Sequence, residues 1–287
     1  MKKIGFIDHS IDEWHATHYP AMIDRSKLGG EYRVAMAWDE GPVEGRKPLA
    51  VWSREQNICA ARSLAELVES CDCLVVLSPD NPEHQERLAD LALRSGKPVY
   101  IDKPFTACRQ GAEACFAKAR QYGSPLMSCS ALRFAPALVR TLETEFRQGP
   151  PTFVSTRGPG RFSVYSIHQL EMLVSALGLG ARRVMRQGGD QADVMQVGYD
   201  DERRGVITLV PASQFGIALG SAGQAVKVLD SLEGYYEGFI DELLRFFGTG
   251  HSLIAPLETL EIVSLVECGL RAHASPNVWF ELPARNV

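Results

Sequence analysis

The residues best placed to do chemistry follow a short apolar strand that we predict from Val99 to Ile101. Asp102, Lys103 and Pro104 come directly after it. Because proline has no N–H and a fixed φ, the chain must turn there, which places the acid and the lysine at the carboxyl end of the strand. Ligands bind at that end of an open parallel α/β sheet. Lys103 is therefore a candidate electrostatic clamp or acid–base group, and a surface Asp-Lys turn is the alternative.

The overall composition excludes several classes of protein. The chain has 287 residues, 45% of them hydrophobic and 23% charged, which is enough for one large domain or two smaller ones. A net charge of −5 and the lack of a basic patch predict no nucleic-acid partner. No apolar run reaches membrane-spanning length, so we predict no membrane partner. Seven scattered cysteines are typical of a reduced compartment, and we expect a cytoplasmic protein.

The first half of the chain, residues 1–128, alternates predicted strands and helices about every thirty residues, which favours an α/β, Rossmann-like, doubly wound parallel sheet. Ser10 or Asp12 is expected to cap the first helix, which runs to about Arg25. Residues 42–57 mix Pro, Gly and charge and are expected to form a surface loop. The predicted strands are 3–8, 32–38, 73–77, 99–101 and 125–128.

The second half, residues 129–287, has a different pattern. Its strand candidates follow one another too closely for crossover helices, so antiparallel pairing is expected. Helices are predicted at 234–247 and 257–273, and the final helix is a candidate to pack back on the first domain. We therefore predict an α+β domain with a mainly antiparallel open sheet. Its strands are predicted at 153–156, 194–197, 205–210, 215–219 and 225–229.

Several motifs occur together in an order that is informative. An apolar strand is followed by Ser78-Pro79, then His84, then Gly96-Lys97-Pro98 and the Asp102-Lys103-Pro104 turn. The segments Ser130–Phe134 and Tyr165–Glu171 follow. With these motifs, the sequence resembles the glucose–fructose oxidoreductase / inositol dehydrogenase / MocA (Gfo/Idh/MocA) family nearly end to end. The Asp-Lys-Pro triplet stands where that family has Glu-Lys-Pro.

The resemblance implies an oxidoreductase that binds NAD or NADP and acts on a sugar, polyol or related small molecule. It places Lys103 near the nicotinamide and the reacting hydroxyl, and makes His168 the acid–base group, with Tyr165 able to contribute a phenol. An imidazole titrates near neutrality and an ammonium stabilises an alkoxide, so these roles are chemically reasonable. The open sheet implies a homodimer or homotetramer.

The resemblance also implies a cofactor surface and a substrate clamp. Arg133 and Arg161, with Arg157, could hold an anionic substrate group, and solvated arginines in turns are the alternative. Asp39 suits a ribose hydroxyl, although an acid there is as common at the start of a loop. The predicted cofactor residues are Ile7, Asp8, His9, Asp39, Ser78, Pro79, His84 and Asp102.

The dinucleotide-binding turn departs from the family pattern. The family expects Gly-x-Gly-x-x-Gly after the first strand, but no glycine lies between Gly5 and Gly29. Asp8, Asp12 and Glu13 instead bring carboxylates to a place that would hold two phosphates. Either the cofactor binds in a displaced position or this pocket no longer takes a dinucleotide.

The second catalytic motif also departs from the pattern. The family aspartate lies four residues before the histidine, and here that position is Val164. Tyr165 or Glu171 could support His168 in its place. In the alternative interpretation, His168 and Glu171 only fasten the start of a helix that packs on the sheet.

Three classes of function remain open. The first is an NAD(P)-dependent oxidoreductase with Lys103 and His168 facing each other across one crevice. The second is a non-redox binding or regulatory protein that has lost the dinucleotide, and the third is a lyase or hydrolase that uses Lys103. No metal site is predicted, because nothing at helical spacing completes a zinc set around His15 and His18, and with His9 they are interpreted as surface or pocket-lining histidines.

Overall fold

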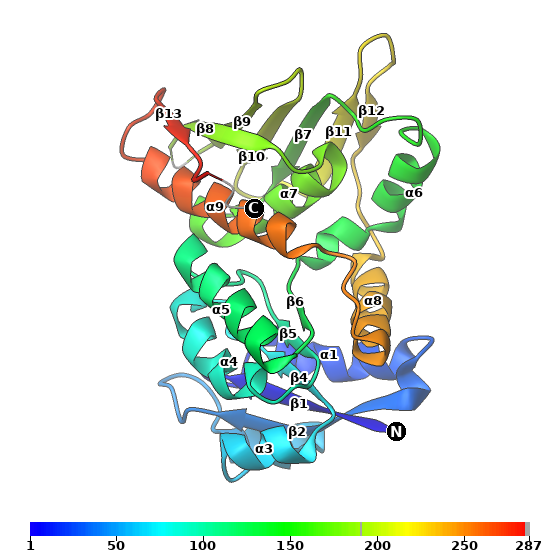
Figure 1. The fold of residues 1–287 in the computed structure, drawn as a ribbon, viewed down its shortest axis with the longest axis vertical. Coiled ribbons are helices and arrows are strands. Elements are labelled where there is room, and N and C mark those ends of the chain that lie inside the picture. The colour runs from blue at the N-terminus through cyan, green and yellow to red at the C-terminus, as the bar shows by residue number, and fades with distance from the viewer. Residues whose placement is uncertain (190, 285–287) are drawn as a thin grey trace. The chain divides into compact units, whose positions relative to one another are not determined.

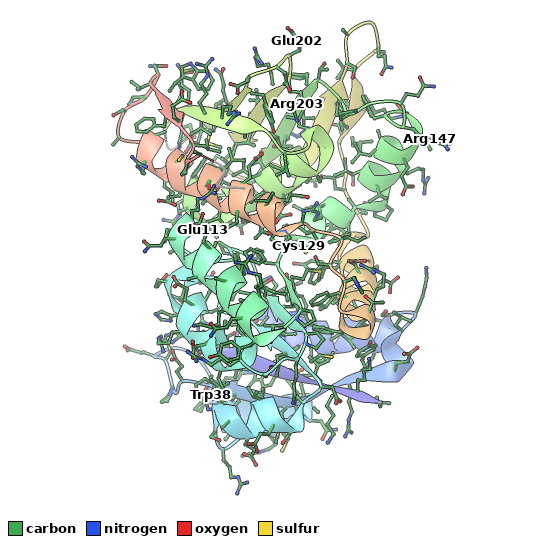
Figure 2. All side chains as sticks on the ribbon, in the orientation of Figure 1. Trp38, Glu113, Cys129, Arg147, Glu202 and Arg203 are labelled. Carbon is green, nitrogen blue, oxygen red and sulfur yellow. The ribbon has the colours of Figure 1, made fainter. Side chains whose placement is uncertain are left out.

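The computed structural model describes residues 1–189 and 191–284, and the chain divides into two compact units (Figure 1). Unit 1 comprises Met1–Cys129 and Phe239–Pro256, and unit 2 comprises Ser130–Gly238 and Leu257–Val287. Figure 2 labels Cys129, the last residue of the longer segment of unit 1. Within the described residues, no helix is both long enough and apolar enough to span a membrane.

Unit 1 contains a six-stranded sheet in the order β3-β2-β1-β4-β5-β6, and all its strand pairs are parallel. The central strands β1, β4 and β5 are apolar and buried, as strands covered by helices on both faces must be. The prediction of a doubly wound parallel sheet is confirmed. The strands are β1 (Lys2–Asp8), β2 (Tyr32–Asp39), β3 (Cys59–Ala60), β4 (Cys73–Val76), β5 (Val99–Ile101) and β6 (Leu126–Met127).

The helices of unit 1 differ from the expectation in two places. Helix α2 forms inside the predicted loop 42–57, because Trp52 is buried and its Nε1 donates a hydrogen bond to Thr17 Oγ1 at 3.1 Å. Helix α1 begins after Glu13, so neither Ser10 nor Asp12 is its cap. The helices are α1 (Trp14–Arg25), α2 (Leu49–Gln56), α3 (Leu64–Ser70), α4 (Gln85–Leu93), α5 (Arg109–Tyr122) and most of α8 (Tyr235–Thr249), with short 3-10 turns at Gly29–Glu31 and Pro82–His84.

The segment that returns to unit 1 is Phe239–Pro256 rather than the final helix. The ring of Phe239 is fully buried, with its centroid 5.7 Å from that of Tyr19 and 5.3 Å from that of Tyr100. Further along α8, the ring centroid of Phe247 lies 6.4 Å from that of Tyr32. Aromatic packing therefore fastens a segment from late in the chain onto α1, β2 and β5 of unit 1.

Unit 2 contains a seven-stranded sheet in the order β12-β11-β7-β10-β9-β8-β13. Its pairs are antiparallel except β7 with β10, which are parallel because α7 and the β8–β9 hairpin lie between them in the chain. The prediction of a mainly antiparallel sheet is confirmed, although β8 and β13 were not predicted. The strands are β7 (Phe153–Gly158), β8 (Ala181–Gly188), β9 (Asp193–Tyr199), β10 (Arg204–Leu209), β11 (Gly216–Gly220), β12 (Lys227–Leu229) and β13 (Trp279–Glu281).

Helix α7 packs against β7 and β10 and supplies much of the core of unit 2. Gln169, a polar side chain on this buried face, has hydrogen-bond partners: it accepts from the Thr156 hydroxyl at 2.9 Å and exchanges hydrogen bonds with the backbone of Thr208. The helices of unit 2 are a 3-10 turn at Ala131–Phe134, α6 (Pro136–Thr144), α7 (Phe162–Leu177) and α9 (Pro256–Ala272).

The packing of α8 gives a stability prediction. Phe239→Ala should lower the free energy of unfolding of the chain by about 3–5 kcal/mol, because it removes a large ring from a filled site. Leu253→Ala is the matched control, since this residue lies on the same returning segment with its side chain 68% exposed. Urea denaturation measures both, and equal effects would mean that the segment does not contribute to the core of unit 1.

Candidate functional site

The turn between β1 and α1 is built from buried polar side chains. Asp8, the last residue of β1, is 1% exposed, and its Oδ1 accepts a hydrogen bond from the Ser10 N–H at 3.2 Å. Burial, reinforced by the nearby charge of Glu13, raises the pKa of Asp8 well above its ordinary value. Ile11 in the same turn is fully buried. The turn is therefore filled by side chains in place of the small residues that the family pattern calls for.

Glu13 caps the amino end of α1. Its backbone is extended, and its carboxylate accepts hydrogen bonds from the His15 N–H at 2.8 Å and from the Ala16 N–H. The His15 ring adds a third contact, with Nδ1 2.8 Å from Glu13 Oε2. The Glu13 side chain is only 4% exposed. The negative charge thus sits on the positive end of the helix dipole, with its oxygens bonded inward.

The Glu13 cap affects the position where the diphosphate of a dinucleotide would bind. In a conventional Rossmann domain the diphosphate binds the free N–H groups at the start of this helix, and glycines let it approach. Here the chain's own carboxylate takes those N–H groups, and a second buried acid lies beside it. The conventional diphosphate position therefore does not fit the residues present.

Asp39, proposed from the sequence as a ribose contact, lies at the end of β2. Its Oδ2 accepts from the Ile11 N–H at 3.2 Å, and the Gly41 N–H also donates to this carboxylate. Burial nevertheless raises the pKa of Asp39. Its oxygens thus fasten the β1–α1 turn to the start of the next loop.

Several buried polar residues surround Lys103 at the carboxyl ends of β4 and β5. Asp102 is 1% exposed; the Tyr100 hydroxyl lies 3.0 Å from its Oδ1, and the side-chain amide of Gln85 donates to its carbonyl. The same Gln85 amide donates to the carbonyl of Ser78, which ties the two strand ends together. Lys103 follows at the turn, partly exposed, and the Lys103–Pro104 peptide is cis.

The imidazole of His15 lies at the same edge of unit 1 as Asp102. Its Nδ1 lies 3.9 Å from Asp102 Oδ2, so the ring is held between that acid and Glu13. His15 is 8% exposed. The sequence showed histidines near the first turn but not this contact, because His15 and Asp102 meet only through the neighbouring β1–β4–β5 strands.

His168 lies on α7 in unit 2, and its Nδ1 is 2.7 Å from the hydroxyl oxygen of Ser130. The Tyr165 ring is tilted beside it, with centroids 6.0 Å apart, and the Phe215 ring meets it edge-on at 5.6 Å. Val164, at the position of the family aspartate, is 39% exposed. A serine hydroxyl from the neighbouring 3-10 turn thus orients the imidazole in this chain.

Glu171 pairs with Arg133 in the interior of unit 2. Arg133 Nη1 lies 2.7 Å from Glu171 Oε2, and the other end of the guanidinium pairs with Glu258. The Ser130 N–H also donates to Glu171, so Ser130 connects the carboxylate to His168. Burial raises the pKa of Glu171 to about 7, even though Arg133 opposes the shift. Arg133, predicted as a substrate clamp, is thus already paired with two acidic side chains of unit 2.

The other predicted arginines lie elsewhere in unit 2. Arg161 is exposed and lines a cavity of about 580 Å³ at the start of α7. Arg186, on the same cavity wall, is paired with Asp193. Arg157 pairs with Asp230 at 3.0 Å.

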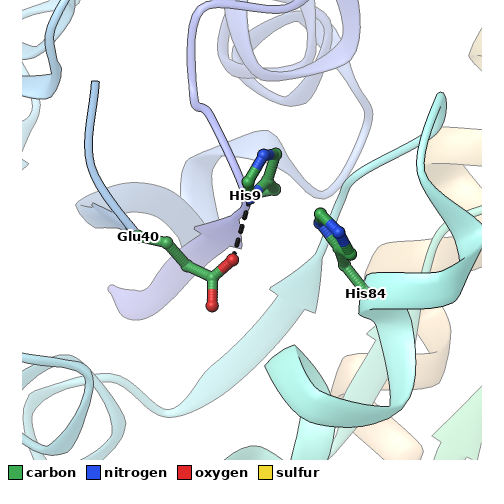
Figure 3. A group of neighbouring side chains, drawn as sticks. All are labelled: His9, Glu40 and His84. Carbon is green, nitrogen blue, oxygen red and sulfur yellow. Dashed lines mark hydrogen bonds and ion pairs between the residues drawn. The ribbon is translucent and has the colours of Figure 1, made fainter. Parts of the chain in front are cut away.

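The remaining predicted cofactor residues fall into two groups. Ile7 is fully buried in β1, and Pro79 is partly exposed at the turn after β4. His9 and His84 come together with Glu40, which was not predicted (Figure 3). The signal available in the sequence was only that each residue follows a different predicted strand of the parallel sheet.

Comparison with known proteins agrees with the fold. Residues 15–129 match the family model of the Gfo/Idh/MocA oxidoreductases, described as having an NAD-binding Rossmann fold. No curated protein matches the chain in sequence. An oxidoreductase from Agrobacterium radiobacter, solved with NAD+, L-tartaric acid and magnesium, is similar with a TM-score of 0.78 at 14% identity over 98% of both chains.

Two further solved structures share the fold. A scyllo-inositol dehydrogenase from Lactobacillus casei has a TM-score of 0.79 at 11% identity, over 98% of both chains. An NAD-binding oxidoreductase from Klebsiella pneumoniae has a TM-score of 0.78 at 14% identity, over 99% of both chains. Residues 15–129 are thus similar to the Gfo/Idh/MocA oxidoreductases, in agreement with the resemblance seen in the sequence. The family match begins at His15, after the turn that departs from the family pattern.

The cap on α1 can be tested by stability. Glu13→Ala should lower the free energy of unfolding by about 1 kcal/mol, the usual cost of losing a helix cap. Glu44→Ala, at an exposed position of the same unit, should change it by less than about 0.5 kcal/mol. Chemical denaturation at pH 7 measures both variants. Equal values for the two would show that Glu13 does not stabilise α1.

The buried Glu171 predicts a pH dependence. Since its folded pKa is about 7 against an ordinary 4.5, the folded state holds a proton that the unfolded state has lost between those values. The contribution of this group to the free energy of unfolding therefore falls by about 3 kcal/mol in total as the pH rises from about 4.5 to 7. Above pH 7 the contribution is constant. Glu171→Gln should remove that fall, measured as the difference in unfolding free energy from wild type at each pH. A difference that stays constant across this range would contradict it.

Proposed function

We propose that the protein is an NAD(P)-dependent oxidoreductase that acts on a small hydroxylated metabolite, such as a sugar, a polyol or a related anion. The single observation that carries the proposal is the family match over residues 15–129, because that segment includes the Asp102-Lys103-Pro104 turn. Solved proteins that share the fold include an inositol dehydrogenase and an oxidoreductase crystallised with NAD+. By the same resemblance we expect a cytoplasmic homodimer or homotetramer.

By the same resemblance, the proposed catalytic groups are Lys103 and His168. The Lys103 ammonium stabilises the substrate oxygen as it gains negative charge, and His168 holds or releases the hydroxyl proton. Ser130 is a positioning residue in this proposal, because its hydroxyl lies 2.7 Å from His168 Nδ1 and so orients the imidazole. Tyr165 borders the imidazole.

The cofactor has to be held without the N–H groups at the start of α1, because Glu13 occupies them. The same observation favours a second candidate function, a non-redox binding or regulatory protein that keeps the scaffold. Val164, at the position of the family aspartate, supports the same alternative. The two candidates differ in whether a dinucleotide binds at all.

Titration with NAD(H) and NADP(H), followed by quenching of tryptophan fluorescence, separates these candidates. Binding at or below millimolar concentration supports the oxidoreductase, and the absence of binding for all four forms overturns it in favour of the non-redox candidate. Glu13→Gln should then tighten dinucleotide binding about two- to five-fold, because it removes a negative charge from the helix end. Glu44→Gln is the control with the same loss of charge at an exposed position.

If a dinucleotide binds, the catalytic roles can be tested directly. Lys103→Ala and His168→Ala should each lower kcat/KM at least about 100-fold, as expected for loss of an acid–base or oxyanion-stabilising group. His251→Ala, at an exposed histidine of unit 1, should leave the rate unchanged. Circular dichroism checks that each variant is folded. Full activity in either of the first two variants would refute its assigned role.

A further inference from the structure

We propose that His9, Glu40 and His84 form a binding site for one divalent first-row transition-metal ion. Each of the three offers a ligand atom, and these atoms all lie within 4.8 Å of one another (Figure 3). All three residues belong to unit 1. The inference stands apart from the proposed function, because it requires neither a dinucleotide nor turnover.

The sheet order explains how these residues meet. His9 follows β1, Glu40 follows β2, and His84 ends the 3-10 turn after β4. Strands β2, β1 and β4 are neighbours and run parallel, so their carboxyl ends lie along one edge of the sheet. That edge is where open α/β sheets bind ligands. The three side chains therefore converge from three loops onto one position.

The distances are compatible with a metal ion after a small adjustment. His9 Nδ1 already lies 2.8 Å from Glu40 Oε2, and the rings of His9 and His84 are 4.2 Å apart and nearly perpendicular. Zinc–nitrogen bonds of about 2.0–2.1 Å at tetrahedral angles separate ligand atoms by about 3.3 Å. The side chains of His9 and His84 are 31% and 24% exposed, so they have room to change rotamer and adjust these separations around an ion.

A second observation at His84 points to a missing partner. Its Nδ1 is buried, yet it has no hydrogen-bond partner within the described part of the chain. Leaving a buried polar atom unpaired costs free energy, and most such atoms in proteins are satisfied. A cation bonded to this nitrogen would provide the partner.

The surrounding charges orient the carboxylate ligand. Arg87 pairs with Glu40 Oε1, while Oε2 faces His9, so one oxygen is held from outside and the other is available to an ion. Glu83 Oε1 lies 3.9 Å from His84 Nε2 and adds negative charge nearby. The positive charge of Arg87 opposes a cation but fixes the geometry of its ligand.

The ligand types define the class of ion. Two imidazoles and one carboxylate suit zinc, cobalt, nickel or ferrous iron, whereas calcium and magnesium prefer oxygen ligands throughout. Three protein ligands leave at least one coordination position for water or for an oxygen-bearing ligand.

The experiment uses the full chain after treatment with a chelator and dialysis. Calorimetric titration with ZnCl₂ should show one ion bound per chain. His9→Ala and His84→Ala should each weaken binding at least about ten-fold. Glu40→Gln, which keeps the shape of the side chain, should weaken it as well. His251→Ala is the matched control, because it removes an exposed histidine of the same unit outside the cluster, and it should bind as wild type does.

Titration with cobalt(II) separates this site from the free cysteines. Binding by nitrogen and oxygen should give visible absorption without a thiolate charge-transfer band, although the chain has seven free thiols. Thermal unfolding of each metal-free variant checks its fold, and zinc should raise the Tm of wild type but not of His84→Ala. The proposal is overturned if zinc does not bind, if all variants bind equally, or if the thiolate band appears. Each of these results is read from metal binding in the absence of dinucleotide, so failure of the metal site is distinguishable from failure of the proposed function.

Discussion

A helix that follows the first strand of a parallel sheet begins with several backbone N–H groups that have no partner, and something must satisfy them. In many nucleotide-binding domains the ligand does so. In this chain the Glu13 carboxylate bonds two of them and the His15 ring as well. Because that carboxylate is buried and negatively charged, it already fills the anion-binding position at the amino end of α1.

The rest of the ligand-binding edge of unit 1 is consistent with this cap. Asp8 and Asp39 are both buried, and their carboxylates accept hydrogen bonds from the Ser10 and Ile11 N–H groups of this turn. Burial raises the pKa of both acids. The turn is thus stabilised by hydrogen bonds within the chain.

Unit 2 holds His168 by a contact that the sequence motif did not predict. The position of the family aspartate is Val164, but Ser130 bonds His168 Nδ1 and, through its N–H, the Glu171 carboxylate. A tertiary contact between Ser130, which precedes a 3-10 turn, and α7 therefore orients the imidazole. The cost is a buried Glu171, which Arg133 partly offsets.

Much of the fold could be read from local pattern. Continuous apolar runs such as Cys73 to Leu77 predict strands buried on both faces, and the later spacing predicts a mainly antiparallel sheet. Helix α2 was missed because its stability comes from burying Trp52 against α1 rather than from its mixed composition. Unpredicted strands such as β8 owe their place to pairing with β9.

The sequence by itself determined the alternation of strands and helices in the first half of the chain, the two classes of sheet, the family resemblance and the absence of a glycine turn. Periodicity, composition and motif spacing are properties of neighbouring residues, so they are visible without coordinates. Only the tertiary structure decided that Glu13 caps α1, that Glu40 joins His9 and His84, and that Ser130 serves His168. The reason is physical: these contacts depend on which strand ends lie side by side and on the backbone angles of the loops between them, and no local pattern encodes either.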